Sequence, residues 1–180
     1  MKSIVIDPPH LQEMIQHAKR DYPNECCGFG FGRGNRVLEV VPICNIALNQ
    51  RVAYLMDEHE QLKALFSALQ KGYEIICIYH SHPNADPIPS QSDINQNHYP
   101  SVAHCIIGIN TQFAEVGVWQ IEYENIERLS LTNSVDHEPT DIIDNPIKNL
   151  IHIAVLLMVA VLVIGVAVYL LPPAPELPLP

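Results

Sequence analysis

The sequence predicts an α+β fold in which helices pack on a mixed β-sheet. Two stretches of the 180-residue chain place apolar residues at helical spacing, and several shorter apolar runs are typical of β-strands. These elements do not alternate strictly between strand and helix along the chain, as they would in a parallel α/β fold. The sequence contains no internal repeat.

The first two elements are a strand and a helix. Residues 3–7, SIVID, predict the strand, and Asp7 followed by Pro8 is typical of a helix start with Asp as the N-cap. An amphipathic helix to about Arg20 is predicted by apolar residues at helical spacing: Leu11, Met14, Ile15 and Ala18.

A strand pair and a second helix follow. Residues 28–47 predict two strands around a turn at Gly34 and Asn35. Residues 57–72 predict the helix, which Gly72 can close at its C-terminus. Four of its residues are expected to line one apolar face: Leu62, Leu65, Phe66 and Leu69.

The remaining elements of the domain are strands. Residues 73–79, YEIICIY, form a nearly continuous apolar run, as expected of a strand that is buried on both faces. Residues 103–110, 115–123 and 126–131 predict the later strands.

Four segments make up the predicted organisation. Residues 1–132 form the functional domain, and residues 133–149 form an acidic linker with two prolines. Residues 150–171 carry no charge and would reach roughly 33 Å as a helix, enough to cross a bilayer core. A buried core helix is the alternative, but soluble helices rarely stay apolar on every face for so long. Residues 172–180 form a proline-rich tail.

The sequence predicts a single-pass C-terminal anchor with the domain in the cytoplasm. Lys148 precedes the span and no Lys or Arg follows it, so the positive-inside rule favours a cytoplasmic N-terminal side. The N-terminus lacks the apolar region of a signal peptide. Five cysteines, an odd number without a CxxC pair, fit reduced thiols.

The charge balance excludes one class of partner. The formal net charge is −10 and the sequence shows no cluster of Lys and Arg. Nucleic-acid binding requires a basic face, so we expect no nucleic-acid partner.

A metal site is predicted where the strand at 73–79 ends. Residues i and i+2 of a strand point the same way, so His80 and His82 project together if the strand continues. Prolines keep the following stretch out of helix and sheet, and Asp93 could return as a third ligand. Two imidazoles and a carboxylate suit zinc and leave a fourth position for water, as in catalytic zinc sites.

Glu25 is a candidate proton acceptor for such a site. It lies between the first helix and a glycine-rich strand, where the backbone can approach a ligand closely. The alternative is an ordinary surface glutamate. Ser90 and Asp93 have an alternative as well, because Ser-x-x-Asp is typical of a capped helix start. A structural zinc site with Cys77 as a fourth ligand is disfavoured, because Cys77 should face away from both histidines.

Other histidines have weaker claims on the site. His98 and His104 lie close to it in the sequence and are candidates for supporting contacts. His10, His17 and His59 are expected on helix surfaces.

The motif resembles that of the JAMM, or MPN-plus, zinc metalloproteases in their compact prokaryotic form. The family has an upstream glutamate, His-x-His-Pro, and Ser-x-x-Asp with seven residues between the second His and the Ser, and every position is filled: Glu25, His80, His82, Ser90 and Asp93. The likeness covers about residues 1–130, in which ECCGFGFG is similar to the family's Glu-x-Cys-Gly stretch.

This resemblance implies roles for the motif residues. His80, His82 and Asp93 would bind one zinc ion per chain, and Glu25 would be general base and then general acid. Ser90 would support the oxyanion of the tetrahedral intermediate. The implied fold is a cytidine-deaminase-like α/β sandwich with a curved, mostly antiparallel sheet.

The resemblance also implies an activity and a class of substrate. The family cuts peptide or isopeptide bonds, often after the C-terminal glycine of ubiquitin-like proteins, and its compact prokaryotic members act on sulfur-carrier proteins as well. This chain lacks room for the long insertions of eukaryotic deubiquitinases, and its predicted anchor lies outside the family pattern. Members of the family often form pairs, so the resemblance also allows a homodimer. The alternative function is an inactive MPN-type scaffold that binds a protein partner at the membrane.

Overall fold

The computed structural model describes residues 2–109, 113–122 and 125–133, all of which belong to a compact unit spanning Met1–Glu138. The predicted membrane helix at 150–171, the tail and the linker beyond residue 133 lie outside the described residues. Within the described ranges, no helix is both long enough and apolar enough to span a bilayer.

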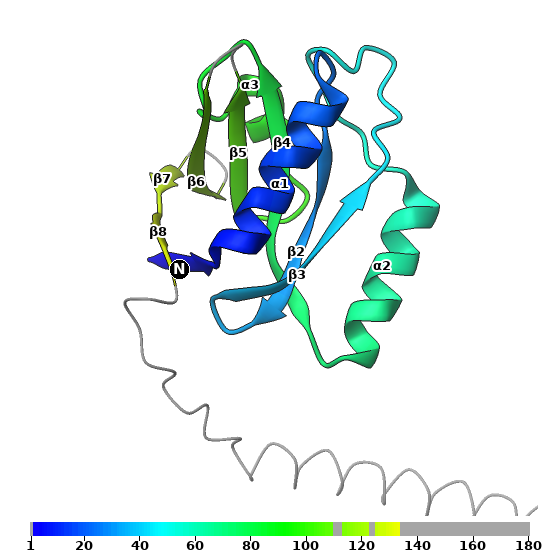
Figure 1. Cartoon of the computed structure of the whole chain (residues 1–180), viewed down its shortest axis with the longest axis vertical. Helices are drawn as coiled ribbons and strands as arrows, with labels where there is room; N and C mark the ends of the chain where they lie inside the picture. Colours follow the sequence, from blue (N-terminus) through cyan, green and yellow to red (C-terminus); the bar gives the residue numbers. More distant parts are fainter. Residues whose placement is uncertain (1, 110–112, 123–124, 134–180) are drawn as a thin grey trace, which may run out of the picture. The chain divides into compact units, whose positions relative to one another are not determined.

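The described residues form one eight-stranded mixed sheet with three helices (Figure 1). In chain order the elements are β1 Ser3–Ile6, α1 Pro8–Asp21, β2 Cys27–Arg33, β3 Arg36–Ile43, α2 Glu58–Gln70, β4 Glu74–Pro83, α3 Gln91–Asn95, β5 Ala103–Ile109, β6 Ala114–Glu122, β7 Asn125–Arg128 and β8 Ser130–Thr132. The sheet order is β7-β6-β5-β4-β2-β3-β1-β8. The predicted α+β fold with both long helices is confirmed, but the one strand predicted at 126–131 is two strands, β7 and β8, interrupted at Leu129.

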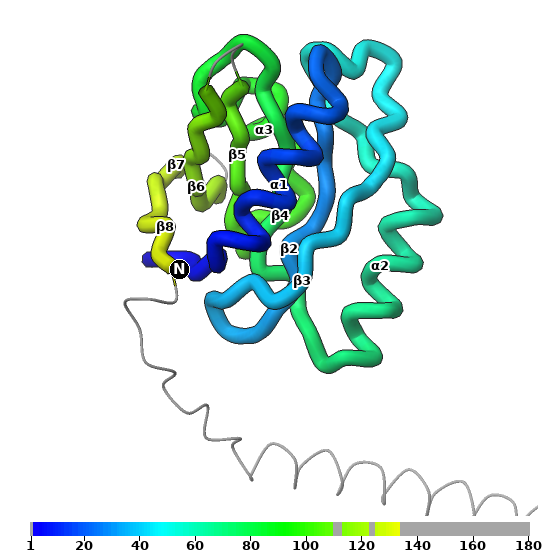
Figure 2. The backbone as a smooth tube through the Cα atoms, viewed as in Figure 1, coloured from blue at the N-terminus to red at the C-terminus, as the bar shows by residue number. Residues whose placement is uncertain are grey.

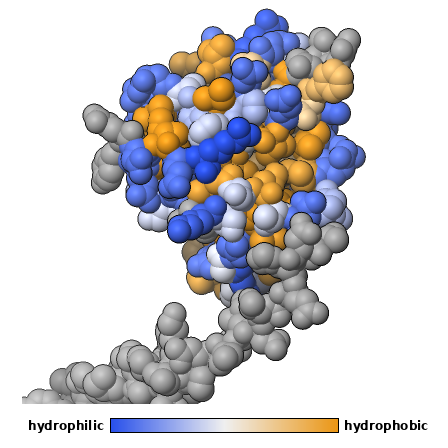
Figure 3. All heavy atoms as spheres, turned by 90° about the vertical axis from the view of Figure 1, so that its left-hand side faces the viewer, coloured by the Kyte–Doolittle hydropathy of each residue, from blue (hydrophilic) through white to orange (hydrophobic). Residues whose placement is uncertain are grey.

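The sheet combines parallel and antiparallel pairs. Strand β1 is parallel to β3 and to β8, and β4 is parallel to β5, while the other pairs are antiparallel. Figure 2 shows β1 and β8 side by side, although they come from opposite ends of the described chain. Seen from the left-hand side of Figure 1, the surface mixes hydrophilic side chains with a hydrophobic band (Figure 3).

Each face of the sheet has its own apolar cluster. On one face, here called the α1 face, Met14 and Ala18 of α1 pack in a cluster with Tyr79 and Cys77 of β4. On the other, the α2 face, Ala64 and Ala68 of α2 pack in a second cluster: Cys27, Phe29, Phe31, Ile43, Met56 and Ile78. Strand β4 therefore contributes alternate side chains to two separate cores.

The glycine-rich strand β2 is explained by this two-sided packing. A Cβ added to Gly28 would lie 2.6 Å from the Tyr79 ring, and one added to Gly30 would lie 2.6 Å from the Cys77 Sγ. The glycines thus make room for large side chains of β4 on the α1 face, while the phenylalanines of β2 fill the α2 face. The two glycines thus allow β2 to lie close to side chains of the neighbouring strand β4. The sequence had suggested instead that the backbone of this strand approaches a ligand.

The predicted apolar face of α2 is wrong for three of its four residues, because only Leu65 packs, partly buried, against the core. Leu62, Phe66 and Leu69 are exposed by 56%, 64% and 70%, whereas Ala64 and Ala68 are buried. Because a helix turns by about 100° per residue, Ala64 lies about 200° around the axis from Leu62. The helix packs through its small residues and leaves a row of large apolar side chains on the surface.

Candidate metal centre

Strand β4 continues past residue 79 and carries both histidines of the motif. His80 pairs with Ile106 and His82 with Gly108 in the parallel ladder with β5. Both side chains project on the α2 face, as the alternation along the strand predicts. The residues are 0% and 8% exposed, so the imidazoles are held within the fold and not at its surface.

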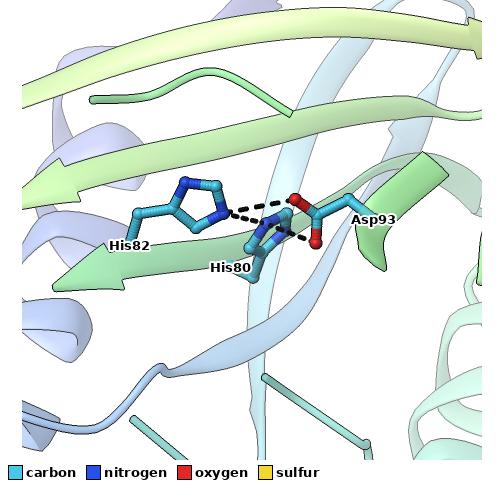
Figure 4. A group of neighbouring side chains, drawn as sticks. All are labelled: His80, His82 and Asp93. Carbon is cyan, nitrogen blue, oxygen red and sulfur yellow. Dashed lines mark hydrogen bonds and ion pairs between the residues drawn. The ribbon is translucent and has the colours of Figure 1, made fainter. Parts of the chain in front are cut away.

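Asp93 returns to the two histidines, as the sequence predicts. Figure 4 shows His80 and His82 extending from β4 toward Asp93, which comes from α3. The Nε2 atoms of the two histidines are 3.1 Å apart. The Asp93 Oδ1 lies 3.4 Å from the His80 Nε2, and the Asp93 Oδ2 lies 3.3 Å from the His82 Nε2. Three ligand atoms thus lie within 4.8 Å of one another.

The loop between β4 and α3 is fixed against the sheet. The Trp119 Nε1 of β6 donates to the Pro87 carbonyl over 2.8 Å. A Cβ on Gly108 would lie 2.7 Å from the Ala85 carbonyl oxygen, and one on Gly117 would collide with the Pro87 carbonyl. Two glycines on neighbouring strands therefore let the proline-rich loop lie directly on the sheet, and this packing leads the chain into α3.

Ser90 begins α3 and orients Asp93. The Ser90 Oγ accepts from the Asp93 N–H over 3.2 Å and donates to the Asp93 Oδ2 over 2.7 Å, and the Ser90 N–H donates to the same oxygen over 2.7 Å. This reciprocal pair is a capping box, the alternative that the sequence offered for Ser-x-x-Asp. Capping and ligation are compatible, because the cap fixes the turn that carries the carboxylate.

The donor set fits a divalent cation. The His82 Nδ1 lies 3.2 Å from the Asp86 carbonyl, which can only accept, so the Nδ1 carries the proton and the Nε2 lone pair points into the site. Burial lowers the pKa of His80, which favours the neutral, ligand form. Burial raises the pKa of Asp93, but hydrogen bonds from the two histidines in their protonated, metal-free forms outweigh it and hold that pKa well below its usual range.

His82 behaves differently from His80 because it shares the Asp93 carboxylate from a less buried position. Burial lowers the pKa of His82, but the hydrogen bond and the charge of Asp93 raise it above its ordinary value. A carboxylate that attracts a proton to a neighbouring imidazole would also attract a metal ion.

Glu25 is buried beside this group. Its residue is 6% exposed, so the alternative of a surface glutamate is wrong. Burial raises its pKa to about 7, while the charge of His82 lowers it and that of Asp93 raises it. Both ligands are thus close enough to act electrostatically on the Glu25 carboxyl. A carboxylic acid with a pKa near neutrality can both accept and donate a proton.

Tyr54 is a site residue that the sequence did not indicate. Its ring stacks on the His80 imidazole with centroids 4.6 Å apart and planes at 26°. It also lines a cavity of about 110 Å³ whose wall includes Asp93, His98 and His104. Tyr54 lies in the loop before α2, and no local sequence signal places its ring against a strand that follows the helix.

The two candidates for supporting contacts, His98 and His104, differ from each other. His104 is 2% exposed, its Nε2 lies 3.1 Å from the Asn97 Oδ1, and burial lowers its pKa to about 4. His98 has an exposed side chain at the same cavity.

The expectation that His17 lies on a helix surface is wrong. It is 5% exposed, with its Nδ1 2.8 Å from the Tyr79 hydroxyl and its Nε2 3.2 Å from Asp21. It therefore belongs to the α1 face. Cys77 also belongs to that face, as predicted, and so points away from the two histidine ligands.

Comparison with known proteins identifies the family. The family model that describes prokaryotic homologues of the JAB domain matches residues 7–122 of this chain. That range contains all five motif residues. The chain belongs to this family. The predicted resemblance to the JAMM proteins is therefore confirmed, and the fold of this JAB chain agrees with it.

Three curated relatives are similar to the JAB domain of this chain. A desampylase of Pyrococcus furiosus is 44% identical over 92 residues, which cover 51% of this chain and 65% of the relative. A Thermus thermophilus protein named for cleaving TtuB-protein conjugates is 38% identical, with 48% and 57% covered. The CysO-cysteine peptidase of Mycobacterium tuberculosis is 31% identical, with 58% and 72% covered. The chain thus spans less than two thirds of the length of the first two. The names of these relatives agree with the predicted class, a JAMM-type metallopeptidase.

A solved structure supports the same fold. The solution structure of a Desulfitobacterium hafniense protein matches with a TM-score of 0.66 and 27% identity, covering 72% of this chain and 92% of that protein.

Proposed function

We propose that this chain is a zinc-dependent isopeptidase or peptidase that cleaves after the C-terminal glycine of a ubiquitin-like or sulfur-carrier protein. The observation that carries the proposal is the convergence of His80, His82 and Asp93, with Glu25 buried beside them. The names of the relatives, a desampylase, a conjugate-cleaving protease and a CysO-cysteine peptidase, support the substrate class.

Zinc is the metal that this donor set favours. Two imidazole nitrogens and one carboxylate oxygen are a common catalytic zinc set, and a site of three protein ligands leaves room for a reacting group. We propose one zinc ion per chain, held by His80, His82 and Asp93. When bound, zinc would polarise the scissile carbonyl and lower the pKa of water at the site.

The residues around the metal would divide the proton chemistry. Glu25 would accept a proton from the attacking water and pass it to the leaving nitrogen, because its raised pKa makes both protonation states accessible. Ser90 holds Asp93 through its hydroxyl. To support a developing oxyanion, as we also propose, that hydroxyl would have to turn its proton from Asp93 to the substrate.

The surface next to the site suits a protein substrate. Leu62, Phe66 and Leu69 form an exposed apolar row on α2, and Gln61 of the same helix lines the cavity whose wall includes Asp93. A folded substrate whose C-terminal tail enters the site could rest its body on this row, because exposed apolar side chains gathered on one element are typical of interaction surfaces.

Three parts of the prediction rest on sequence alone. We propose attachment to a membrane through residues 150–171 and a cytoplasmic position for residues 1–132, based on the uncharged span and on Lys148. A homodimer stays a prediction as well.

The proposal is tested by measuring zinc and hydrolysis on the same purified chain. We expect close to one zinc per chain in the wild type and in Glu25→Gln, and none in His82→Ala. Wild type should release an amine that is linked to the C-terminal glycine of a ubiquitin-like protein, and both variants should fail to do so. A folded wild type that takes up no zinc would exclude the hydrolase and favour the scaffold alternative.

A further inference from the structure

The loop between β3 and α2 encloses the backbone of Glu25. The Glu25 N–H donates to the Gln50 carbonyl over 2.7 Å, and the Glu25 carbonyl accepts from the Asn45 Nδ2 over 2.8 Å. Both polar groups of this buried residue's main chain are therefore paired with a loop that lies 20 or more residues further along the chain. Sequence reasoning gave no role to either partner.

Asn45 uses its whole side chain in these contacts. Its amide also donates to the Ala53 carbonyl over 3.1 Å, and its Oδ1 accepts from the N–H groups of Ala47 and Leu55, both over 3.0 Å. An asparagine side chain offers two donor hydrogens and two acceptor positions, and all four are used here. Asn45 is 9% exposed, so breaking any of these hydrogen bonds would leave a polar group unpaired in a largely buried environment.

The main chain after Glu25 is fixed by a different element. The Cys26 N–H donates to the Ser81 Oγ over 2.9 Å, and the Ser81 N–H donates to the Cys26 carbonyl over 3.1 Å. Ser81 lies between the two histidine ligands, and Cys27 pairs with His80 in the sheet. Strand β4 thus fixes the main chain of residue 26 relative to the two histidine ligands. The loop between β3 and α2 fixes the main chain of residue 25.

We propose that Asn45 is a positioning residue that holds the carboxylate of Glu25 in place for proton transfer at the metal centre. This inference rests on the proposed function. Without the donor of Asn45, the Glu25 carbonyl would lose its partner and the loop would lose its central tie, so the carboxylate could move. A displacement of about 1 Å in a reacting group costs on the order of 100-fold in rate.

Two variants separate positioning from a merely structural role. Asn45→Ala removes all four hydrogen bonds. Asn45→Asp has nearly the same shape and keeps the acceptors for Ala47 and Leu55, but it lacks the hydrogens that reach Glu25 and Ala53. Met14→Ala is the stability control, because Met14 is fully buried on the opposite face of the sheet and has no part in the site.

The experiment measures zinc content, kcat and KM for a ubiquitin-like conjugate at a temperature where each full-length variant is folded. We expect both Asn45 variants to bind one zinc and to keep KM within about threefold, while kcat falls on the order of 100-fold. Met14→Ala should keep kcat within about twofold. Should Asn45→Ala not fold, Asn45→Asp carries the comparison.

Wild-type kcat in zinc-loaded Asn45→Asp would overturn the inference, since the loop would then need only the acceptors. Amide hydrogen exchange at Glu25 in the metal-free chain gives a readout that is independent of turnover. We expect protection in wild type and Met14→Ala and its loss in Asn45→Ala. Protection that is unchanged in Asn45→Ala would also overturn the inference. If zinc-loaded wild type cleaves nothing, the proposed function fails, and the exchange measurement still decides whether Asn45 holds Glu25.

Discussion

The two long helices have similar apolar spacing in the sequence, yet they use it in opposite ways. Helix α1 turns its large apolar residue Met14 into the sheet, where it is fully buried. Helix α2 turns two alanines inward and leaves Leu62, Phe66 and Leu69 more than half exposed. The comparison teaches that helical periodicity identifies an amphipathic helix but not the purpose of its apolar side. Helix α1 buries large apolar side chains in the core, whereas α2 leaves three of its four largest apolar side chains exposed.

The same division runs along strand β4. Cys77 and Tyr79 point into the core under α1, whereas His80 and His82 point to the side of α2. One strand therefore contributes to an apolar core on each face and carries the candidate metal centre on the α2 face. Substitutions on the two faces should affect different measured quantities.

The largest expected difference is between two residues of β4, His82 and Tyr79, that point to opposite faces of the sheet. His82→Ala should abolish zinc binding and lower turnover to background, because two ligands do not hold a catalytic zinc. Tyr79→Phe removes only the hydroxyl that pairs with His17 on the α1 face, so it should keep zinc and turnover. It should lower the free energy of unfolding by about 1 kcal/mol. Zinc analysis and urea unfolding check both, and loss of zinc in Tyr79→Phe would contradict this separation of the faces.

Next in size is the stability difference between the two helices. Met14→Ala should lower the free energy of unfolding by about 2–5 kcal/mol, because it leaves a cavity in a fully buried site. Leu69→Ala on the exposed side of α2 should change it by no more than about 0.5 kcal/mol. Urea unfolding of both variants beside wild type measures the two values. Equal losses would show that the exposed row of α2 is covered within the folded chain.

A buried histidine on each face gives a pH-dependent comparison. Burial lowers the pKa of His104 to about 4, so the unfolded chain, with an ordinary value near 6.5, takes up the proton first as the pH falls. The contribution of His104 to the free energy of unfolding is therefore fully present above about pH 6.5. It is lost as the pH falls toward 4, by up to about 3 kcal/mol. Burial also lowers the pKa of His17, but the neighbouring Asp21 opposes this, so its loss should be smaller.

Urea unfolding at pH 7 and pH 4.5 checks this prediction. Between pH 7 and pH 4.5, the free energy of unfolding of His104→Gln should fall by less than that of the wild type. The fall for His17→Gln should be closer to that of the wild type. The opposite ranking would mean that Asp21 does not compensate for the burial of His17.

Much of the fold and the metal centre could be predicted from the sequence, because short-range rules govern them. Alternation along a strand put His80 and His82 on one side, and a capped helix start accounts for Asp93. The turn at Gly34 follows from a backbone that favours glycine, with a φ of +63°. Each of these rules involves residues only a few positions apart.

The errors concern contacts between distant parts of the chain. The inward side of α2 packs against a cluster that contains Phe29 and Phe31, where Ala64 and Ala68 are buried. The main chain of buried Glu25 is hydrogen-bonded to Asn45 and Gln50, and the buried side chain of His17 to Tyr79. A single sequence does not show which distant side chains meet, so no periodicity could have revealed these contacts.

The smallest expected effect tests the exposed row of α2 directly. Phe66 is 64% exposed, so Phe66→Ala should leave zinc content and the free energy of unfolding unchanged within about 0.5 kcal/mol. If the body of a ubiquitin-like substrate rests on the row, KM for the intact conjugate should rise about five- to tenfold, while kcat stays near the wild-type value. A short peptide that ends in the same glycine and carries the same leaving group reaches only the metal centre, so its kcat/KM should not change. An equal rise in KM for peptide and conjugate would place the effect in the site itself, and no rise for either would leave the exposed row of α2 without a part in substrate binding.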